Sequence, residues 1–213
     1  MDIIMKTRYD KLGPKVAAAL EGRGFEAYYC STLSEAREKA LSFIPIGSTI
    51  GYGGTLTLNQ IDLKDTFRNG DYNLIDRDLA PTPEEKTALQ RAAFSADWYI
   101  MGCNGISEDG QLFNIDGIGN RVAALIYGPD HVLIVAGMNK VVKSTEDAYS
   151  RARNIAAPAN MQRFSGLGTP CSVTGACADC NSPGCICNQI VFTRRCNPPK
   201  RIKVILIGED LGL

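Results

Sequence analysis

The chain has 213 residues, 45% of them hydrophobic and 22% charged, which is ordinary for a soluble globular protein with one well-buried core. Twenty-three basic residues balance 23 acidic ones, so the charge gives no case for binding nucleic acid. No apolar stretch approaches the roughly 20 residues that span a bilayer, and residues 1–6 lack the pattern of a signal peptide. We therefore expect a cytoplasmic protein without membrane contact, in which thiols stay reduced.

The first half of the chain alternates between strand-like and helical patterns. The expected strands are residues 25–30, 48–52 and 72–76. The expected helices are residues 10–21, a second that follows Thr32 through Ile44, and a third that follows Thr82 to about Ser95. Thr32 and Thr82 each have a glutamate three residues later, which is the capping-box pattern of a helix start.

The second half predicts strands at residues 98–102, 123–127, 131–136 and 203–208. Residues 105–116 predict a β-hairpin with an Asp-Gly turn, and a helix should start at Ser144 and break or end at Pro158. Helices between strands imply a three-layer α/β fold with a largely parallel sheet, which should also contain the hairpin. We expect residues 1–213 to form one domain, with residues 169–200 as a cysteine-rich loop inside it.

A glycine-rich turn directly follows the strand predicted at residues 48–52 and precedes a helical pattern. Glycines at such a junction let backbone N–H groups approach an anionic ligand. The residues concerned are Gly51, Gly53, Gly54 and Thr55. The alternative is a tight turn in which the glycines only relieve steric strain.

Polar residues at the ends of later strands are further candidates for a ligand pocket. Arg121 could hold a carboxylate or phosphate with two hydrogen bonds, and Asp116 could accept one from a substrate hydroxyl. A lysine at a strand end, such as Lys140, can meet an anion as a point charge. The expected set also includes Asn104, Asn114 and Asn139. Alternatively, these groups bond turn backbone, form a structural salt bridge or lie on the surface.

Six of the eight cysteines fall in the last 43 residues: Cys171, Cys177, Cys180, Cys185, Cys187 and Cys196. Four thiolates, from Cys171, Cys177, Cys180 and Cys187, would suffice for tetrahedral zinc or an iron–sulfur cluster. Cys185 and Cys196 would then be spare or alternative ligands. The other interpretation is reduced buried thiols, or disulfides formed in air. His131 is the only histidine, and its place at the start of a strand favours a structural role.

Several motifs together resemble the lactate-utilisation (LUD) domain family. They are Gly51-Tyr52-Gly53-Gly54-Thr55-Leu56-Thr57-Leu58, residues 114–123, Gly137-Met138-Asn139-Lys140-Val141-Val142, and Arg153 with residues 156–160. The resemblance implies the fold of ribose-5-phosphate isomerase, glucosamine-6-phosphate deaminase and coenzyme A transferases. It also implies a place in the multi-protein oxidation of L-lactate to pyruvate. It assigns no catalytic residues, although Ser107-Glu108-Asp109-Gly110 faintly resembles the glutamate loop of the transferases.

These observations leave three hypotheses about the function of the protein. The first is a component of lactate utilisation that binds a small carboxylate or phosphorylated ligand. The second is an iron–sulfur or zinc-binding accessory subunit that contacts redox partner proteins. The third is a transferase or isomerase acting on a coenzyme A or sugar-phosphate substrate. A homo-oligomer is compatible with each of them. The chain lacks the Cys-x2-Cys-x2-Cys-x3-Cys spacing of the family's ferredoxin-type partners.

Overall fold

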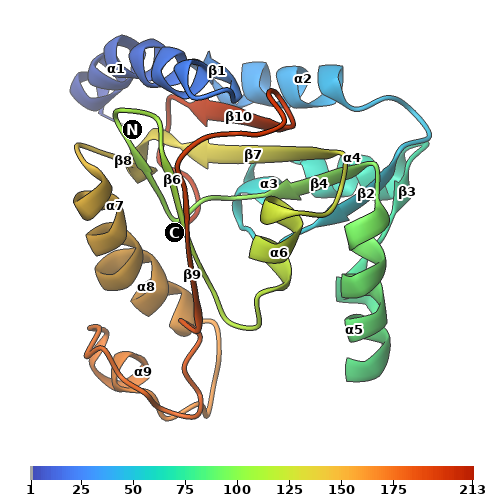
Figure 1. Cartoon of the computed structure of the whole chain (residues 1–213), viewed down its shortest axis with the longest axis vertical. Helices are drawn as coiled ribbons and strands as arrows, with labels where there is room; N and C mark the ends of the chain where they lie inside the picture. Colours follow the sequence, from blue (N-terminus) through green and yellow to red (C-terminus); the bar gives the residue numbers. More distant parts are fainter. Residues whose placement is uncertain (1) are drawn as a thin grey trace.

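A six-stranded parallel sheet forms the centre of the computed structural model, which describes residues 2–213. Its strands occur in the order β1 (Glu26–Cys30), β10 (Ile202–Ile207), β7 (His131–Gly137), β4 (Trp98–Met101), β2 (Thr49–Tyr52) and β3 (Asn73–Leu74). The prediction of an α/β fold with a largely parallel sheet is confirmed. Figure 1 shows β10 and β7 crossing the molecule beneath α1 (Ile3–Gly22).

Helices cover both faces of this sheet, because neighbouring residues of a strand point to opposite faces. In β7, Val132 and Ile134 pack with α1 and with α6 (Asn120–Ile126), whereas Leu133 and Val135 pack with α2 (Leu33–Phe43), α3 (Thr57–Gln60) and α4 (Leu63–Asn69). A strand buried on both sides needs a continuous apolar run, which the residues 132–136 provide.

The predicted hairpin forms, but it belongs to a second sheet, so its placement in the main sheet was wrong. This four-stranded sheet has the order β8 (Val141–Val142), β5 (Gly105–Ser107), β6 (Leu112–Asp116) and β9 (Gln189–Thr193). Phe113 and Ile115 of β6 pack against α7 (Thr145–Arg151) and the start of η4 (Ala152–Ala156). These contacts hold one face of β6 on α7, while Leu112 of the same strand joins the core cluster of the parallel sheet.

Local capping signals placed three helix starts correctly. The hydroxyls of Thr32 and Thr82 accept hydrogen bonds from the backbone of Glu35 and Glu85, and Ser144 forms a reciprocal capping box with Asp147. The first helix starts earlier than predicted, at Ile3, with Asp2 as its cap.

One prediction of element type was wrong, and the predicted break at Pro158 takes the form of a π-helical stretch. Residues 123–127 were expected as a strand, but α6 spans most of them, because a short apolar run fits a buried helix equally well. The helix from Ser144 passes through Pro158 into α8 (Ala157–Met161). A π-helical stretch, η4, precedes this proline, and an interrupted hydrogen-bond ladder accommodates a residue without an N–H.

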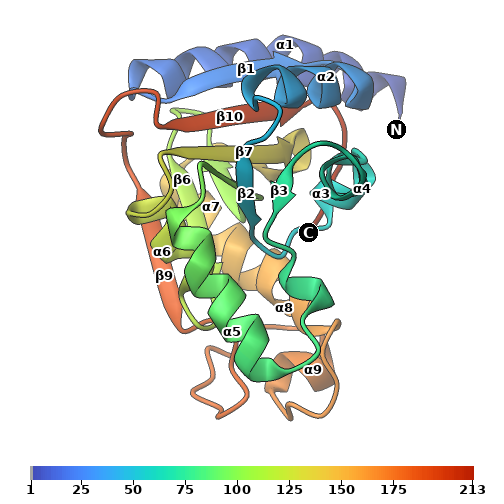
Figure 2. The same ribbon diagram turned by 90° about the vertical axis from the view of Figure 1, so that its right-hand side faces the viewer.

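The cysteine-rich residues 169–200, expected as a loop, contain the short helix α9 (Pro170–Thr174) and strand β9. Figure 2 shows α9 and the loop around it beyond the end of α8, away from the parallel sheet. The remaining elements are η1 (Arg77–Leu79), α5 (Pro83–Ala92), η2 (Ala93–Ser95) and η3 (Met138–Lys140). Within residues 2–213, no helix combines the length and apolar character that a membrane crossing requires.

One close contact fixes α1 on the sheet. Gly13 faces the ring of Tyr29, and a Cβ at this position would overlap the ring. We expect Gly13→Ala to lower the free energy of unfolding by about 1–3 kcal/mol through overpacking, despite the ~1 kcal/mol that alanine gains over glycine inside a helix. Urea unfolding followed by circular dichroism measures the change. Gly22→Ala is the matched control, because a Cβ at Gly22 meets no atom within 4 Å; equal behaviour of the two variants would contradict the packing argument.

Candidate functional site

The carboxyl ends of three neighbouring parallel strands carry most of the predicted site residues. Strands β2, β4 and β7 are adjacent, so the loops that follow them lie at the same edge of the sheet, where α/β proteins commonly bind ligands. The residues concerned lie in segments 53–57, 102–104 and 138–140.

Arg121 of α6 joins these loops to the second sheet. Its two Nη groups donate four hydrogen bonds, to the oxygens of Gly102, Ile115, Asn114 and Asn104 at 3.2, 2.6, 2.7 and 3.0 Å, and its Nε forms an ion pair with Asp116 Oδ2 at 3.3 Å. The two Nη groups of a guanidinium carry four N–H donors, so neither has a donor left for a ligand in this arrangement. Arg121 and the three polar side chains around it therefore act as the frame of the site.

Lys140 is the buried cation of the site. Lys140 is only 3% exposed, and burial lowers the pKa of its ammonium to about 8. The cations Arg151 and Arg121 lower this pKa further, and no carboxylate is among the groups that act on it. Its positive charge thus lacks a counter-ion, and burying an unpaired charge is costly.

Two hydroxyls lie beside Lys140. Thr55 and Lys140 both face Gly102: Thr55 Oγ1 lies 2.8 Å and Lys140 Nζ 3.8 Å from the position that a Cβ on this glycine would take. Thr57 and Lys140 both face Gly212 in the same way, with Thr57 Oγ1 at 2.8 Å and Lys140 Nζ at 2.9 Å from its Cβ position. Thr57 is fully buried, and its hydroxyl has no hydrogen-bond partner within residues 2–213. An unsatisfied buried hydroxyl costs about 1–3 kcal/mol, and an acceptor at this position would satisfy both groups.

Arg77 of η1 is a site residue that the sequence analysis missed. Its Nη2 lies 3.0 Å from the position of a Cβ on Gly54, and its Nε is buried without a hydrogen-bond partner within the described chain. The nearest carboxylate oxygen, of Asp78, is 3.9 Å from Nε. The guanidinium lies 5.7 Å from the centroid of the Tyr52 ring. Arg77 belongs to no motif, and only the pairing of β3 with β2 brings it to the glycine turn.

Three other predicted residues have structural contacts. Gly51 lies within β2, where a Cβ would be 2.7 Å from that of Ala93, so it allows η2 to pack on the sheet. Gly53 donates its N–H to Ile100 O at 2.8 Å, and a Cβ there would meet the Arg121 stem at 2.8 Å. Asn139 Oδ1 accepts from the N–H of Leu211 at 3.1 Å.

The C-terminal segment, residues 209–213, covers Lys140. Besides the bond to Asn139, Gly212 N–H donates to Gln60 Oε1 at 2.9 Å, and Gly212 is the residue that faces both Lys140 and Thr57. In Figure 2 the C-terminus lies between α3 and α8. A ligand that reaches Lys140 from this side must displace the segment.

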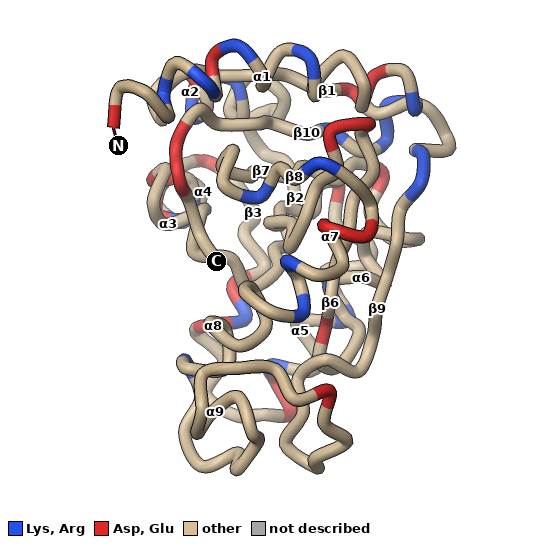
Figure 3. Tube along the Cα trace, turned by 90° about the vertical axis from the view of Figure 1, so that its left-hand side faces the viewer, with Lys and Arg blue, Asp and Glu red and all other residues tan. Residues whose placement is uncertain are grey.

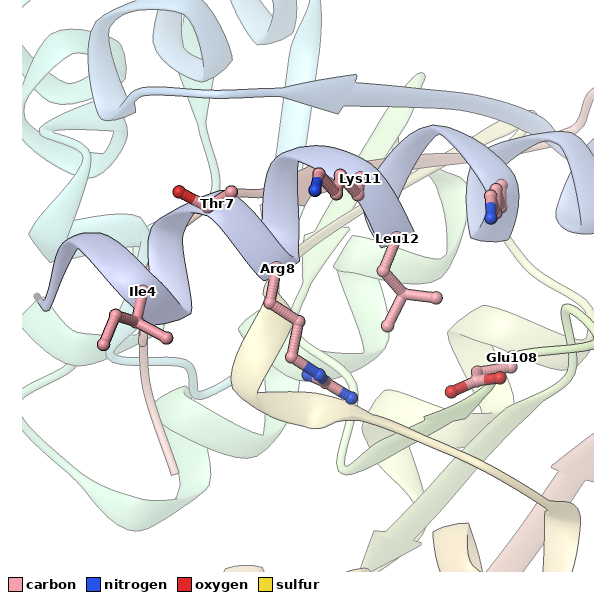
Figure 4. Close-up of a pocket in the computed structure, with 7 residues that line it drawn as sticks. Ile4, Thr7, Arg8, Lys11, Leu12 and Glu108 are labelled. Carbon is pink, nitrogen blue, oxygen red and sulfur yellow. The ribbon is translucent and has the colours of Figure 1, made fainter.

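Glu108 and His131 lie elsewhere. Glu108 lines an open groove of about 490 Å³ beside α1, where Figure 4 shows it across from Arg8 and Leu12. Its carboxylate pairs with Lys143 at 2.7 Å. His131 begins β7, at the opposite end of that strand from Lys140, and packs on Trp98 with 4.5 Å between ring centroids.

The predicted metal ligands line one small cavity of about 70 Å³. Cys171, Cys177, Cys180 and Cys187 are joined there by Cys185. Cys196 is buried apart from them, with its thiol 3.1 Å from Pro198 O. All eight cysteines are free thiols. Within residues 2–213, no group of three or more ligand side chains is already gathered closely enough to hold a metal ion.

The fold and the site define an α/β protein with a cationic, glycine-lined rim at the carboxyl end of a parallel sheet. The model of the LUD domain matches residues 14–207, and the chain belongs to the LUD domain family, which is linked to lactate utilisation. No curated protein matches the sequence.

One solved structure shows the same fold over most of the chain, and two others are similar to it over part of their length. A DUF162 family protein from Deinococcus radiodurans has a TM-score of 0.54 at 13% identity, over 93% of this chain and 97% of that chain. Ribose 5-phosphate isomerase A from Methanocaldococcus jannaschii has a TM-score of 0.34 at 18% identity, over 53% and 54%. The eIF2B delta subunit from Chaetomium thermophilum has a TM-score of 0.34 at 16% identity, over 67% and 57%.

The role of Arg121 as a frame predicts a large effect on stability. We expect Arg121→Met to lower the free energy of unfolding by about 3–5 kcal/mol, because it removes the counter-ion of the buried Asp116 carboxylate and the hydrogen-bond donor of the buried Asn114 amide oxygen. Arg163→Met is the control, since Arg163 is exposed and bonds only the nearby Asn160. Urea unfolding measures both. A loss below about 1 kcal/mol, the range of exposed ion pairs, would contradict this role.

Because the charge of Lys140 is buried, we expect its removal to increase the stability of the protein. In a buffer without small anions, Lys140→Met should raise the free energy of unfolding near pH 7 by about 3 kcal/mol, the cost implied by lowering a lysine pKa to about 8. Wild-type stability should rise from about pH 8 to about pH 10, because the unfolded chain keeps its proton longer than the folded one. The variant should lack that part of the rise. If the stability of the wild type and of Lys140→Met changes with pH in parallel, Lys140 is not buried as a charge.

Proposed function

We propose that this LUD-domain protein binds a small carboxylate or phosphorylated ligand at the rim formed by Lys140, Arg77, Thr55 and Thr57, as a component of lactate utilisation. The buried ammonium of Lys140, without a carboxylate and beside the unpartnered hydroxyl of Thr57, carries the proposal. An anion at this position supplies the missing counter-ion and the missing acceptor together.

Charge favours an anion over a neutral ligand. Electrostatic interactions strengthen when water is excluded, and Lys140 lies in such a place. Arg77 adds a second cation with unused donors beside Gly54. Arg121 contributes through position, since its donors are engaged and its stem fills the space next to Gly53.

Lysine and arginine bind anions in different ways, so together they can hold either a carboxylate or a phosphate. The compact ammonium acts as a point charge, whereas the planar guanidinium can give two parallel hydrogen bonds to a carboxylate or phosphate. L-Lactate and pyruvate carry a carboxylate, and a phosphate monoester carries a phosphate. The segment 209–213 then controls access, because its contacts to Asn139 and Gln60 hold it over Lys140.

A transferase acting through Glu108 is not favoured, because this carboxylate pairs with Lys143 beside α1. A metal-binding accessory role is favoured by a separate observation, the five thiols that line one cavity. The two roles are compatible, since the cavity and the rim use different residues.

Titration calorimetry of the full chain with L-lactate, pyruvate, inorganic phosphate and ribose 5-phosphate tests the anion site. We expect at least one of them to bind, with affinity reduced about 10- to 100-fold by Lys140→Met and by Arg77→Met, the value of one hydrogen bond to a charged group. Lys143→Met is the control, because its side chain is 81% exposed. Affinity should also fall as the pH rises through about 8.

The absence of binding by all four anions would contradict the proposal, and so would binding that neither substitution weakens. Circular dichroism of each variant shows that the fold is kept.

A further inference from the structure

Five thiols from different turns of the chain meet in one cavity beyond α8. Its other walls combine the apolar side chains of Ala157, Pro158, Met161 and Ile186 with the polar side chains of Arg153, Thr169 and Asp179. Between residues 166 and 188, Asp179 is the only charged residue, and this region is mostly tan in Figure 3. The five thiols are therefore the most numerous candidate metal ligands on the walls of the cavity.

We propose that this cavity holds a metal centre ligated by the thiolates of Cys171, Cys177, Cys180 and Cys187. Thiolates are soft ligands that select zinc, copper(I) and iron–sulfur centres over hard cations such as magnesium. Four of them complete a tetrahedral zinc site or the ligand set of an iron–sulfur cluster. The inference does not depend on the proposed anion site.

Local structure brings the first three thiols to the cavity. Cys171 lies in α9, which Thr169 caps by accepting from Ser172 N–H at 3.3 Å. Gly175, with φ of 74°, ends α9 and reverses the chain toward Cys177. Asp179 has φ of 47°, so the chain turns again between Cys177 and Cys180. Two sulfurs from one tight turn are a frequent metal-binding arrangement.

Cys187 reaches the cavity from the opposite side. It is half-buried against the apolar cluster of Phe113 and Ile115 on β6, just before β9. A bound metal cation at this position would stabilise its thiolate. The four sulfurs are not yet gathered around one point, so metal binding must draw the cysteine-rich segment together, as it does in many small metal-binding segments.

Cys185 is assigned a supporting role. Its sulfur accepts from the N–H of Cys187 at 3.4 Å, and its own N–H donates to Ser182 O at 2.9 Å. These bonds shape the turn that carries Cys187.

Arg153 is the positioning residue of the proposed centre. Its Nη2 lies 3.6 Å from Cys177 Sγ, and the same guanidinium forms an ion pair with Asp179. Four thiolates around Zn²⁺ carry a net charge of −2, so a neighbouring cation offsets charge that would otherwise be buried. Groups in this position orient the ligands, and their removal weakens metal binding by about 10- to 100-fold.

Metal analysis of the full chain, purified without oxygen and loaded with either zinc or iron plus sulfide, tests the proposal. We expect one zinc ion per chain, or iron with acid-labile sulfide and visible absorbance. Cys177→Ser should abolish the bound metal, whereas Cys185→Ser and the control Cys30→Ala, in β1, should retain it. Failure to load with either metal would overturn the proposal, as would a Cys180–Cys185 disulfide in the oxygen-free protein.

The ligand set has its own tests. Metal retained by Cys177→Ser, or lost from Cys185→Ser, would overturn the assignment. Arg153→Met should keep the stoichiometry but weaken zinc affinity about 10- to 100-fold in a chelator competition, with Arg163→Met as control. Unchanged affinity would remove Arg153 from the centre. Calorimetry with the anions separates this proposal from the function proposed above, since either site can fail alone.

Discussion

The hydrogen-bonded guanidinium of Arg121 is the contact on which the site depends. It ties α6 to Gly102 after β4, to Asn104 before β5, and to β6. One side chain thereby joins the parallel sheet to the smaller sheet. Because both of its Nη groups are fully engaged, Arg121 holds the loops around it through the protein's own contacts, and Lys140 and Arg77 remain as the other cations of the site.

Lys140 and Arg77 are those remaining cations, and the fold maintains them at a cost. Lys140 is buried without a carboxylate, and Arg77 has a buried nitrogen without a partner. Proteins keep such groups where a bound ligand completes them. In the proposed function, a bound anion would supply the partner that these two groups lack.

The helix formed by α7, η4 and α8 contacts both proposed sites. Arg151 donates to Asn139 O at 3.0 Å and to Asn104 O at 2.6 Å, beside Lys140. Two residues later, Arg153 contacts Cys177. The π-helical stretch lies here, and such stretches often occur at functional positions. The cysteine-rich segment and the rim therefore both contact one continuous helical element.

Patterns within the chain were sufficient for the parallel sheet, the capped helices, the glycine turn, Lys140 and the clustering of the cysteines, because each depends on a short local signal or on chain order. Contacts across the fold settled the rest. The separate sheet of the hairpin, the helical state of residues 123–126 and the engagement of Arg121 follow from long-range packing. Arg77 reaches the rim only through strand pairing, which no local pattern encodes.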